Sequence, residues 1–421
     1  MNARRALHWL AVMGGVALFG GAALHFLPAD VPSAPAARLI LPTLSTPAPE
    51  VSPTADSPLP ALALIQGLKA RRLVLLPLSG AGVPLEIDRG VQVWPLLPSP
   101  DGTRLLYGSA GAVMVFDATA RRAIIVGELP AGGRLVGAQW SPAGDAVAYV
   151  VQSEHHAVAS YAPADGSALP VELLRVPAGL DVDVGWLRDG RPVVLYLGLG
   201  AAGGLQPHYR VYDPVAREFV ALSPDEAEQV QQPWAPWRSP DGTQQVYAVS
   251  TWQNARFRGA CRTGPLGLAD DSWLPAYSLS QGAARPLAFA VEGLFMDRPT
   301  WLQDGRILFR AIADAACARG QSGLYVGRPG ETPSRLVAVE PDPAPDDADR
   351  APLGVAYAVD PAQTRLVWSE NDSAARRSRV SLMPLEGGEV RTIYYTSPLL
   401  DDAQPFAYRD QEIILYLVWL G

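Results

Sequence analysis

The sequence has few of the residues, and none of the motifs, from which common active sites are built. Its 421 residues include 5 histidines and 2 cysteines. It contains no G-x-S-x-G nucleophile elbow, no H-E-x-x-H zinc motif and no glycine-rich phosphate-binding loop. These absences exclude the signatures of serine hydrolases, zinc proteases and P-loop proteins. We therefore predict no catalytic residue and no cofactor.

Positive charge is also scarce. Lysine and arginine total 34 against 42 for aspartate and glutamate, which gives a net charge of −8. A broadly basic face for nucleic acid is therefore not expected, although a local basic patch remains open. Charged residues make up 18% of the sequence and hydrophobic residues 48%. This composition indicates a large folded core and not a disordered chain.

Two segments carry metal-ligating residue types without the spacing of a metal site. Glu154, His155 and His156 are consecutive, so on an extended strand neighbours point to opposite faces. The acidic run from Asp342 to Asp349 has carboxylates suited to calcium, but it is interrupted by prolines and lacks a suitably placed glycine. We interpret the first as a solvated loop and the second as a solvated connector, and predict no metal.

The amino-terminal segment, residues 1–27, is predicted to be a short cytoplasmic tip followed by a transmembrane signal anchor. Arginines at positions 4 and 5 precede an apolar run from Ala6 to Leu27, which is long enough to cross a bilayer. Basic residues on that side predict that the rest of the chain lies outside the cytoplasm. The alternative is secretion after cleavage at a signal-peptide site near Ala34-Pro35-Ala36.

Residues 28–62 are predicted to form an extracytoplasmic linker. The segment from Pro28 to Pro60 contains 9 prolines among Ala, Ser and Thr, a composition typical of extended chain. The remaining residues, 63–421, are assigned to one all-β domain.

A turn followed by an apolar strand recurs through that domain. The best copy is Trp140-Ser141-Pro142-Ala143-Gly144 with the strand Ala146 to Val151 after it. Proline favours the second position of a turn, and glycine accepts the positive φ that closes it. Seven copies are predicted, with fourth turn positions at Gly102, Gly144, Gly190, Gly242, Gly305, Gln363 and Gln411.

Spacings of this size in an all-strand sequence predict a β-propeller with one four-stranded blade per repeat. Tryptophans before the turns and aromatic residues in the strands after them are expected to pack between blades. They are Trp140, Trp186, Trp237, Trp301, Tyr107, Tyr149, Tyr247, Trp368 and Tyr416.

The two ends of the domain are expected to share the last blade. A hairpin from Leu73 to Ile87 precedes the first turn, and the last turn, Tyr408 to Gln411, has no outer strands after it. Two strands from each end would complete a seventh blade and close the ring. The fold class is therefore an all-β, seven-bladed propeller closed by amino- and carboxyl-terminal strands, with six or eight blades as alternatives.

The repeat resembles that of TolB-like, WD-like bacterial propellers. The resemblance rests on the Trp-Ser-Pro-Asp-Gly pattern before a short hydrophobic strand and covers about residues 70 to 419. It implies the fold and little about activity, because such propellers have many roles. It does not extend to the helper domain of TolB, so a Pal-type partner is not implied.

Long insertions are predicted at the end of the blades opposite the tight turns, at 197–207, 250–275, 312–322 and 370–378. Such loops on a rigid scaffold are where binding usually resides. Three of them carry a basic, aromatic-containing patch suited to an anionic partner. Its residues are Trp252, Arg256, Phe257, Arg258, Arg262, Trp273, Arg319, Arg376, Arg377 and Arg379.

Cys261 and Cys317 lie in the first two of these three insertions. Outside the cytoplasm they are expected to form a disulfide that joins adjacent loops, with two free thiols as the alternative.

The sequence leaves two hypotheses about function. The first is a membrane-anchored binding or scaffolding module of the bacterial cell envelope, whose partner is an envelope protein or an anionic envelope component. The second is an envelope hydrolase or lyase with its active site in the propeller channel, which requires carboxylates or histidines that converge there.

Overall fold

A computed structural model describes residues 59–67, 71–78, 83–93, 95–180, 182–187, 189–199, 205–220, 230–231, 239–249, 256–258, 261–270, 286–314, 317–339, 355–372, 377–396 and 414–421. These residues form strands and turns, and none of them belongs to a helix long and apolar enough to cross a membrane. The predicted signal anchor and residues 28–58 of the predicted linker lie outside the described residues.

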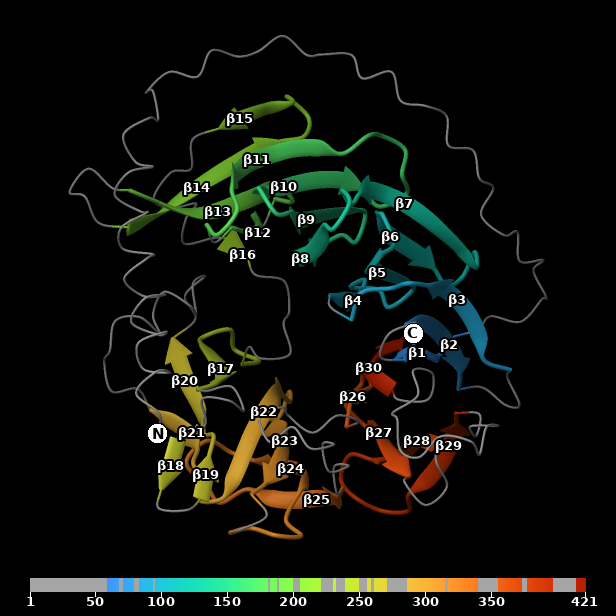
Figure 1. Ribbon diagram of the computed structural model, residues 1–421, viewed down its shortest axis with the longest axis vertical. Helices are drawn as coiled ribbons and strands as arrows, with labels where there is room; N and C mark the ends of the chain where they lie inside the picture. Colours follow the sequence, from blue (N-terminus) through green and yellow to red (C-terminus); the bar gives the residue numbers. More distant parts are fainter. Residues whose placement is uncertain are drawn as a thin grey trace, which may run out of the picture. The chain divides into compact units, whose positions relative to one another are not determined.

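The described chain is a β-propeller. Its strands form five four-stranded sheets, one five-stranded sheet, one three-stranded sheet and a separate two-stranded hairpin. The first four strands of each larger sheet pair in antiparallel order, as Figure 1 shows for β22 to β25. The predicted seven blades are therefore confirmed, since the three-stranded sheet makes the remaining blade.

The blades are numbered along the ring from the first complete one. Blades 1 to 3 are β4(Leu96–Pro98), β5(Arg104–Ser109), β6(Ala112–Asp117), β7(Arg122–Glu128); β8(Arg134–Trp140), β9(Ala146–Gln152), β10(His156–Pro163), β11(Val171–Pro177); and β12(Val182–Leu187), β13(Pro192–Leu199), β14(Leu205–Asp213), β15(Glu218–Val220), with β16(Val230–Gln231) added beside β12.

Blades 4 to 7 complete the order. They are β17(Gln244–Ala248), β20(Leu266–Asp270), β21(Leu287–Phe289), with the hairpin β18(Arg256–Arg258) and β19(Cys261–Thr263); β22(Leu294–Trp301), β23(Ile307–Ala313), β24(Gly323–Gly327), β25(Ser334–Ala338); β26(Tyr357–Val359), β27(Arg365–Asp372), β28(Arg377–Pro384), β29(Arg391–Tyr395); and β30(Ile414–Leu420), β1(Ala61–Gln66), β2(Arg72–Pro77), β3(Leu85–Arg89).

Apolar side chains pack between consecutive blades. Six clusters each join strands of two neighbouring blades, and for the junction of blades 3 and 4 the described residues give no such cluster. Representative pairs are Leu420 with Tyr107, Leu106 with Trp140, Val150 with Trp186, Val246 with Phe309, Leu308 with Trp368, and Val367 with Trp419. The predicted packing role is confirmed for Trp140, Trp186 and Trp301, whereas Trp237 lies outside the described residues.

The first strand of each complete blade forms its inner edge. Within the ring, β30 contacts both β4 and β26, and β8 contacts β12. Antiparallel pairing places the 1–2 and 3–4 connections of every blade at one end, which we call the turn end. The 2–3 connections and the links between blades lie at the opposite, loop end.

Six of the predicted tight turns are present, and they share one hydrogen-bond pattern. In each, the amide of the fourth residue donates to the carbonyl of the first, as from Gly144 to Ser141 at 2.9 Å. Gly144 has a φ of 72°, a conformation that glycine adopts without a steric penalty. The serine side chain adds a second closure, because Ser141 Oγ accepts from the Ala146 amide.

The sequence analysis placed the seventh turn between the first and second strands of its blade, and this placement was wrong. Its residues lie outside the described part, but the strand after it, β30, is a first strand and not a second one. Trp419 thereby takes the position of Trp140: the Arg365 guanidinium lies over its ring, as Arg104 lies over Trp140. Sequence periodicity could not separate these cases, because an apolar strand near a turn can precede or follow it.

The closing blade consequently has three amino-terminal strands and one carboxyl-terminal strand, not two from each end. β1, which begins at Ala61 within the predicted linker, pairs with β2 on one side and β30 on the other. Figure 1 shows β30 beside β1.

Two predicted insertions also contain strand. The segment 197–207 extends the β13–β14 hairpin, with Leu199 paired to Leu205. The segment 250–275 includes β20, which pairs with β17 as the next strand of blade 4. Both segments contain polar or glycine residues, so the sequence did not indicate strands there. Strand pairing in a blade depends on the neighbouring strand as well as on local propensity.

Candidate functional site

The insertions that carry the predicted basic patch lie at the loop end of blades 4 to 6. Their 2–3 connections span 249–265, 314–322 and 373–376, and the strand order places all three at the same end of consecutive blades. The predicted disulfide is confirmed: Cys261 and Cys317 are bonded, with a Cα–Cα distance of 5.7 Å. It joins the insertion of blade 4 to that of blade 5.

Main-chain hydrogen bonds fasten the same insertion to β22. The Gly264 amide donates to Leu294 O at 3.1 Å, and the Met296 amide donates to Gly264 O at 2.9 Å. The Gly293 amide also donates to Thr263 Oγ1 at 3.2 Å. A Cβ at Gly264 would lie 2.3 Å from the Phe295 ring, so this close approach requires glycine.

The loop from 314 to 322 in blade 5 is held by its own bonds. The Cys317 and Ala318 amides both donate to Asp314 O, and the Ala313 amide donates to Ser322 Oγ. The Arg335 guanidinium of β25 donates to Gly320 O at 2.6 Å. Both partners of the disulfide therefore belong to well-connected segments.

The predicted patch residues are only partly within the described structure. Arg256, Phe257 and Arg258 form β18, Arg262 lies in β19, and Arg377 begins β28; for these the backbone alone is described. Arg319 is exposed, whereas Arg379 is half-buried and forms an ion pair with Glu370 across β27 and β28. Trp252, Trp273 and Arg376 lie outside the described residues.

A second polar site, which the sequence analysis missed, lies on β22 and β23. Arg310 is almost fully buried and pairs with Asp297, its cross-strand neighbour. Its Nε donates to Asp297 Oδ1 at 2.7 Å, and its Nη1 donates to Val355 O at 3.1 Å. Burial lowers the pKa of Arg310, but the charge and hydrogen bonds of Asp297 outweigh burial, so the net pKa is raised.

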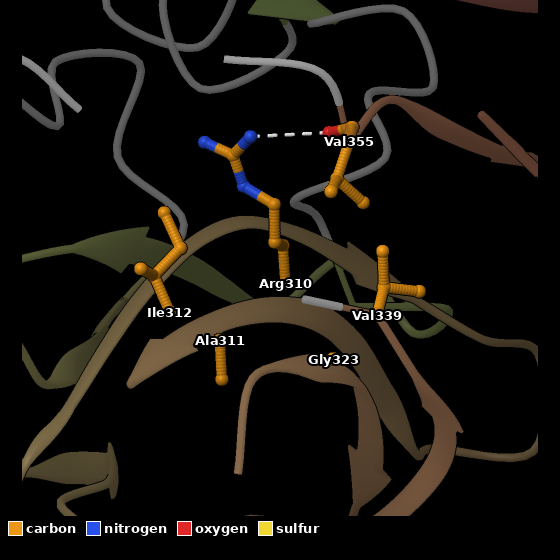
Figure 2. Close-up of a pocket in the computed structure, with 6 residues that line it drawn as sticks. All are labelled: Arg310, Ala311, Ile312, Gly323, Val339 and Val355. Atoms are coloured by element: carbon orange, nitrogen blue, oxygen red, sulfur yellow. Dashed lines mark hydrogen bonds between the residues drawn. The ribbon is translucent and has the colours of Figure 1, made fainter. Parts of the chain in front are cut away.

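Figure 2 shows how Arg310 occupies this place. Its side chain extends from β23 on the same side as Ile312 and reaches the Val355 carbonyl, while Ala311 points to the other side. The depression around it, which Gly323 and Val339 also line, leaves no cavity large enough for a water molecule. Arg310 is therefore a structural group that joins blade 5 to blade 6, and it is not open to a ligand.

Arg298, beside this pair, is arranged differently. It lies in an irregularity of β22 between Asp297 and Thr300, with a φ of 49°. The Tyr357 hydroxyl of blade 6 donates to its carbonyl. Its guanidinium lies 5.8 Å from the centre of the Tyr416 ring, which belongs to blade 7. A side chain that reaches from blade 5 to blade 7 crosses the inner edge of blade 6.

The side chain of Arg298 is exposed to solvent, and protein atoms also surround part of it. Its pKa is nevertheless lowered, first by burial among protein atoms and then by repulsion from the charge of Arg310. Burial likewise raises the pKa of Tyr416, although Arg298 opposes that shift. Arg298 therefore lies at the inner edges of the blades, beside Tyr416.

Asp183 on β12 shows the same combination. Its side chain reaches solvent, yet burial raises its pKa to about 6, opposed by a hydrogen bond from the Val184 amide at 2.8 Å. Its Oδ1 faces Gly137 of β8, where a Cβ would lie 3.7 Å away. Asp183 therefore belongs to the inner surface between blades 2 and 3.

An active site in the channel requires carboxylates or histidines that converge. The polar residues described above at or beside the inner strands are instead Asp183, Asp297, Arg298 and Arg310. No group of three or more His, Cys, Asp or Glu residues placed to hold a metal occurs in the part of the chain that the structure describes. Glu154 and His155 are exposed in the β9–β10 connection, and the acidic run 342–349 lies outside the described residues.

One sequence signal could have found the inner site. Arg310 interrupts the apolar strand Ile307 to Ile312, and a charge inside a buried strand requires a partner. The identity of that partner, and the reach of Arg298 to Tyr416, depend on blade order and register.

Comparisons with known proteins show similarity to β-propellers at low identity. The propeller domain of the Trilobed protease from Pyrococcus furiosus has 12% identity and a TM-score of 0.44, over 80% of this chain and 95% of that one. A putative 6-phosphogluconolactonase from Bacteroides fragilis has 12% identity and a TM-score of 0.44, over 88% and 100%.

TolB from Acinetobacter baumannii has 13% identity and a TM-score of 0.34, over 80% of this chain and 66% of that one. No protein-family model and no curated protein sequence matches the chain. Similarity this low carries no argument about activity, and the similar structures include both enzymes and TolB. The propeller assignment rests on the sheets described above.

Proposed function

We propose that this protein is a membrane-anchored β-propeller outside the cytoplasm that serves as a binding or scaffolding module of a bacterial cell envelope. Its partner is an anionic envelope component or a protein with an acidic surface. The apolar run 6–27 and the disulfide support this location, because structural disulfides persist in oxidising compartments.

The observation that carries the binding role is the fastening of the blade 4 insertion to blade 5. A disulfide and main-chain hydrogen bonds hold Cys261 to Gly264 against Cys317 and β22. A recognition segment that is ordered before binding loses less conformational entropy when its partner arrives. Because β18 and β19 carry Arg256, Arg258 and Arg262, this ordered segment suits an acidic partner.

Charge reversal tests the proposal. We expect R256E/R258E/R262E to lose most of the acidic material that the wild-type chain retains from envelope extracts, with retention in the wild type falling as salt is raised. The matched control is R122E/R217E/R328E, which reverses three exposed arginines at the turn end. Equal retention by both variants would show that the arginines of the insertion do not bind the acidic partner.

Location has its own test. We expect the chain to fractionate with membranes and its propeller to be digested by protease added to cells with a permeabilised outer barrier. Mass spectrometry of the mature amino terminus then separates an uncleaved anchor from cleavage near residue 36. A propeller that resists protease until the cytoplasmic membrane is lysed would contradict the proposed location.

A further inference from the structure

The inner edge of blade 5 carries two arginines, Arg298 and Arg310, beside one carboxylate, Asp297. Asp297 and Arg310 form a close ion pair and cancel each other. Arg298 follows directly in the chain, and among the described residues no carboxylate forms an ion pair with it. Its only described guanidinium contact is the Tyr416 ring. Its five N–H donors suit an anionic or hydrogen-bonding partner.

The backbone directs Arg298 away from its own sheet. Three other non-glycine residues have positive φ, namely Arg121, Arg217 and Gln363, and all three lie in turns; Arg298 is in a strand. Bulges of this kind re-aim side chains and occur often near functional sites. Here the bulge is held by the Tyr357 hydroxyl on the Arg298 carbonyl and is followed by Pro299, so the side chain is directed by fixed neighbours.

We infer that Arg298 forms an anion-binding site at the inner edges of blades 5 to 7, which accepts a small molecule through a carboxylate or phosphate group. The planar guanidinium can donate two parallel hydrogen bonds to either oxyanion. The Tyr416 ring and the blade 6 edge exclude part of the surrounding water, which strengthens such a contact. This site is separate from the loop-end insertion and does not depend on the role proposed for that surface.

The proposal is tested by anion-dependent stabilisation. The melting temperature of the purified full-length protein is measured with inorganic phosphate and, separately, with acetate, each against chloride at equal ionic strength. We expect at least one of the two to raise the wild-type melting temperature by about 2 °C at ten times its dissociation constant. Phosphate alone, acetate alone or both identifies the oxyanion class.

The decisive variant is R298G. Glycine accepts the positive φ, so the fold is retained while the guanidinium is removed. The matched control is R217G, which removes the same side chain from another positive-φ position in an exposed turn. We expect R298G to lose the anion-dependent shift and R217G to keep it, and R298K to bind roughly tenfold more weakly because lysine lacks the planar fork.

Two results would overturn the site. One is an equal anion-dependent shift in R298G and the wild type, which would place binding elsewhere or leave only a general salt effect. The other is a wild-type protein that neither phosphate nor acetate stabilises beyond chloride. Capture through the loop-end arginines is measured independently of both results, so failure of one proposal does not decide the other.

Discussion

At the scale of single residues, the two arginines of blade 5 show how burial and pairing decide a role. Arg310 satisfies its guanidinium with Asp297 and the Val355 carbonyl, so removing either charged partner would leave a buried charge without compensation. Arg298 has one aromatic contact and remains open to solvent. The first is suited to holding two blades together and the second to receiving a ligand.

Asp183 gives a prediction about pH. Its folded pKa of about 6 lies above the ordinary aspartate pKa of 3.8, so the folded state holds the proton more tightly than the unfolded chain. The contribution of protonated Asp183 to the free energy of unfolding is therefore fully present below pH 3.8. It is lost as pH rises through about 6. We expect D183N to be more stable than the wild type at pH 7.5, by on the order of 1 kcal/mol after allowing for solvent screening, and equal to it near pH 3.5.

Urea unfolding across this pH range measures the effect. Asp165 provides a control of opposite sign, because hydrogen bonds from Ser167 lower its pKa. D165N should be less stable than the wild type at pH 7.5 and should lose this difference only as pH falls below 3.8, whereas D183N should be more stable than the wild type at pH 7.5. A D183N curve parallel to the wild-type curve at all pH values would show that Asp183 is not desolvated.

At the scale of elements, the tight turns reach one geometry through three chemistries. Ser141 Oγ and Ser239 Oγ accept the amide five residues on, at 3.0 and 2.9 Å. Asp360 does the same through Oδ1, which accepts from the Arg365 amide at 2.7 Å. Where Leu187 and Leu302 stand in place of the acceptor, Asp189 and Asp304 accept from the following arginine amides. The turn is therefore retained although its sequence varies.

The disulfide gives a prediction at this scale. Cys261 and Cys317 are 56 residues apart, so the bond removes considerable freedom from the unfolded chain. We expect C261S/C317S to reduce the free energy of unfolding by about 2–4 kcal/mol. Urea unfolding of this variant, and of the reduced wild type as its control, should give matching midpoints below that of the oxidised protein.

Hydrogen exchange places the same effect in the molecule. Without the disulfide, the Gly264 and Met296 amides should exchange faster, because the insertion then depends on its main-chain bonds to β22. The Gly144 amide in blade 2 should exchange as before. Unchanged protection at Gly264 would show that the main-chain bonds hold the insertion without help from the disulfide.

At the scale of the whole molecule, β30 closes the ring. It pairs with β1 and contributes Leu420 to the cluster shared with blade 1 and Trp419 to the cluster shared with blade 6. The carboxyl-terminal residue continues this contact, since the Gly421 amide donates to Gly102 O at 3.0 Å. A single strand therefore joins the first and last described segments of the propeller and its two neighbouring blades.

A pair of glycine substitutions tests this closure. Gly102 and Gly111 both have positive φ, but a Cβ at Gly102 would lie 2.9 Å from Gly421 N, whereas one at Gly111 meets nothing within 4 Å. Both alanine variants should lose about 1 kcal/mol through backbone strain. We expect G102A to lose roughly 1–2 kcal/mol more, because backbone must shift at the closing strand. Equal unfolding free energies for G102A and G111A would show that the Gly421 contact contributes nothing.

The local features of this fold could be predicted from the sequence because they depend on neighbours in the chain. Six turn positions, the apolar strands after them and the packing of Trp140, Trp186 and Trp301 follow from turn chemistry and from where the bulky residues stand. The disulfide was predicted for a different reason, because two cysteines outside the cytoplasm have only one possible pairing.

Other features required the tertiary structure, because they depend on which blades become neighbours and in what register. The strand Ile414 to Leu420 could precede or follow a turn, and only its pairing with β1 makes it the first strand of the closing blade. Arg310 finds Asp297 across a strand pair, and Arg298 reaches Tyr416 across another blade. Turn geometry is set by hydrogen bonds within a few residues, whereas a charge buried between blades is stabilised or left uncompensated by groups far away in the chain.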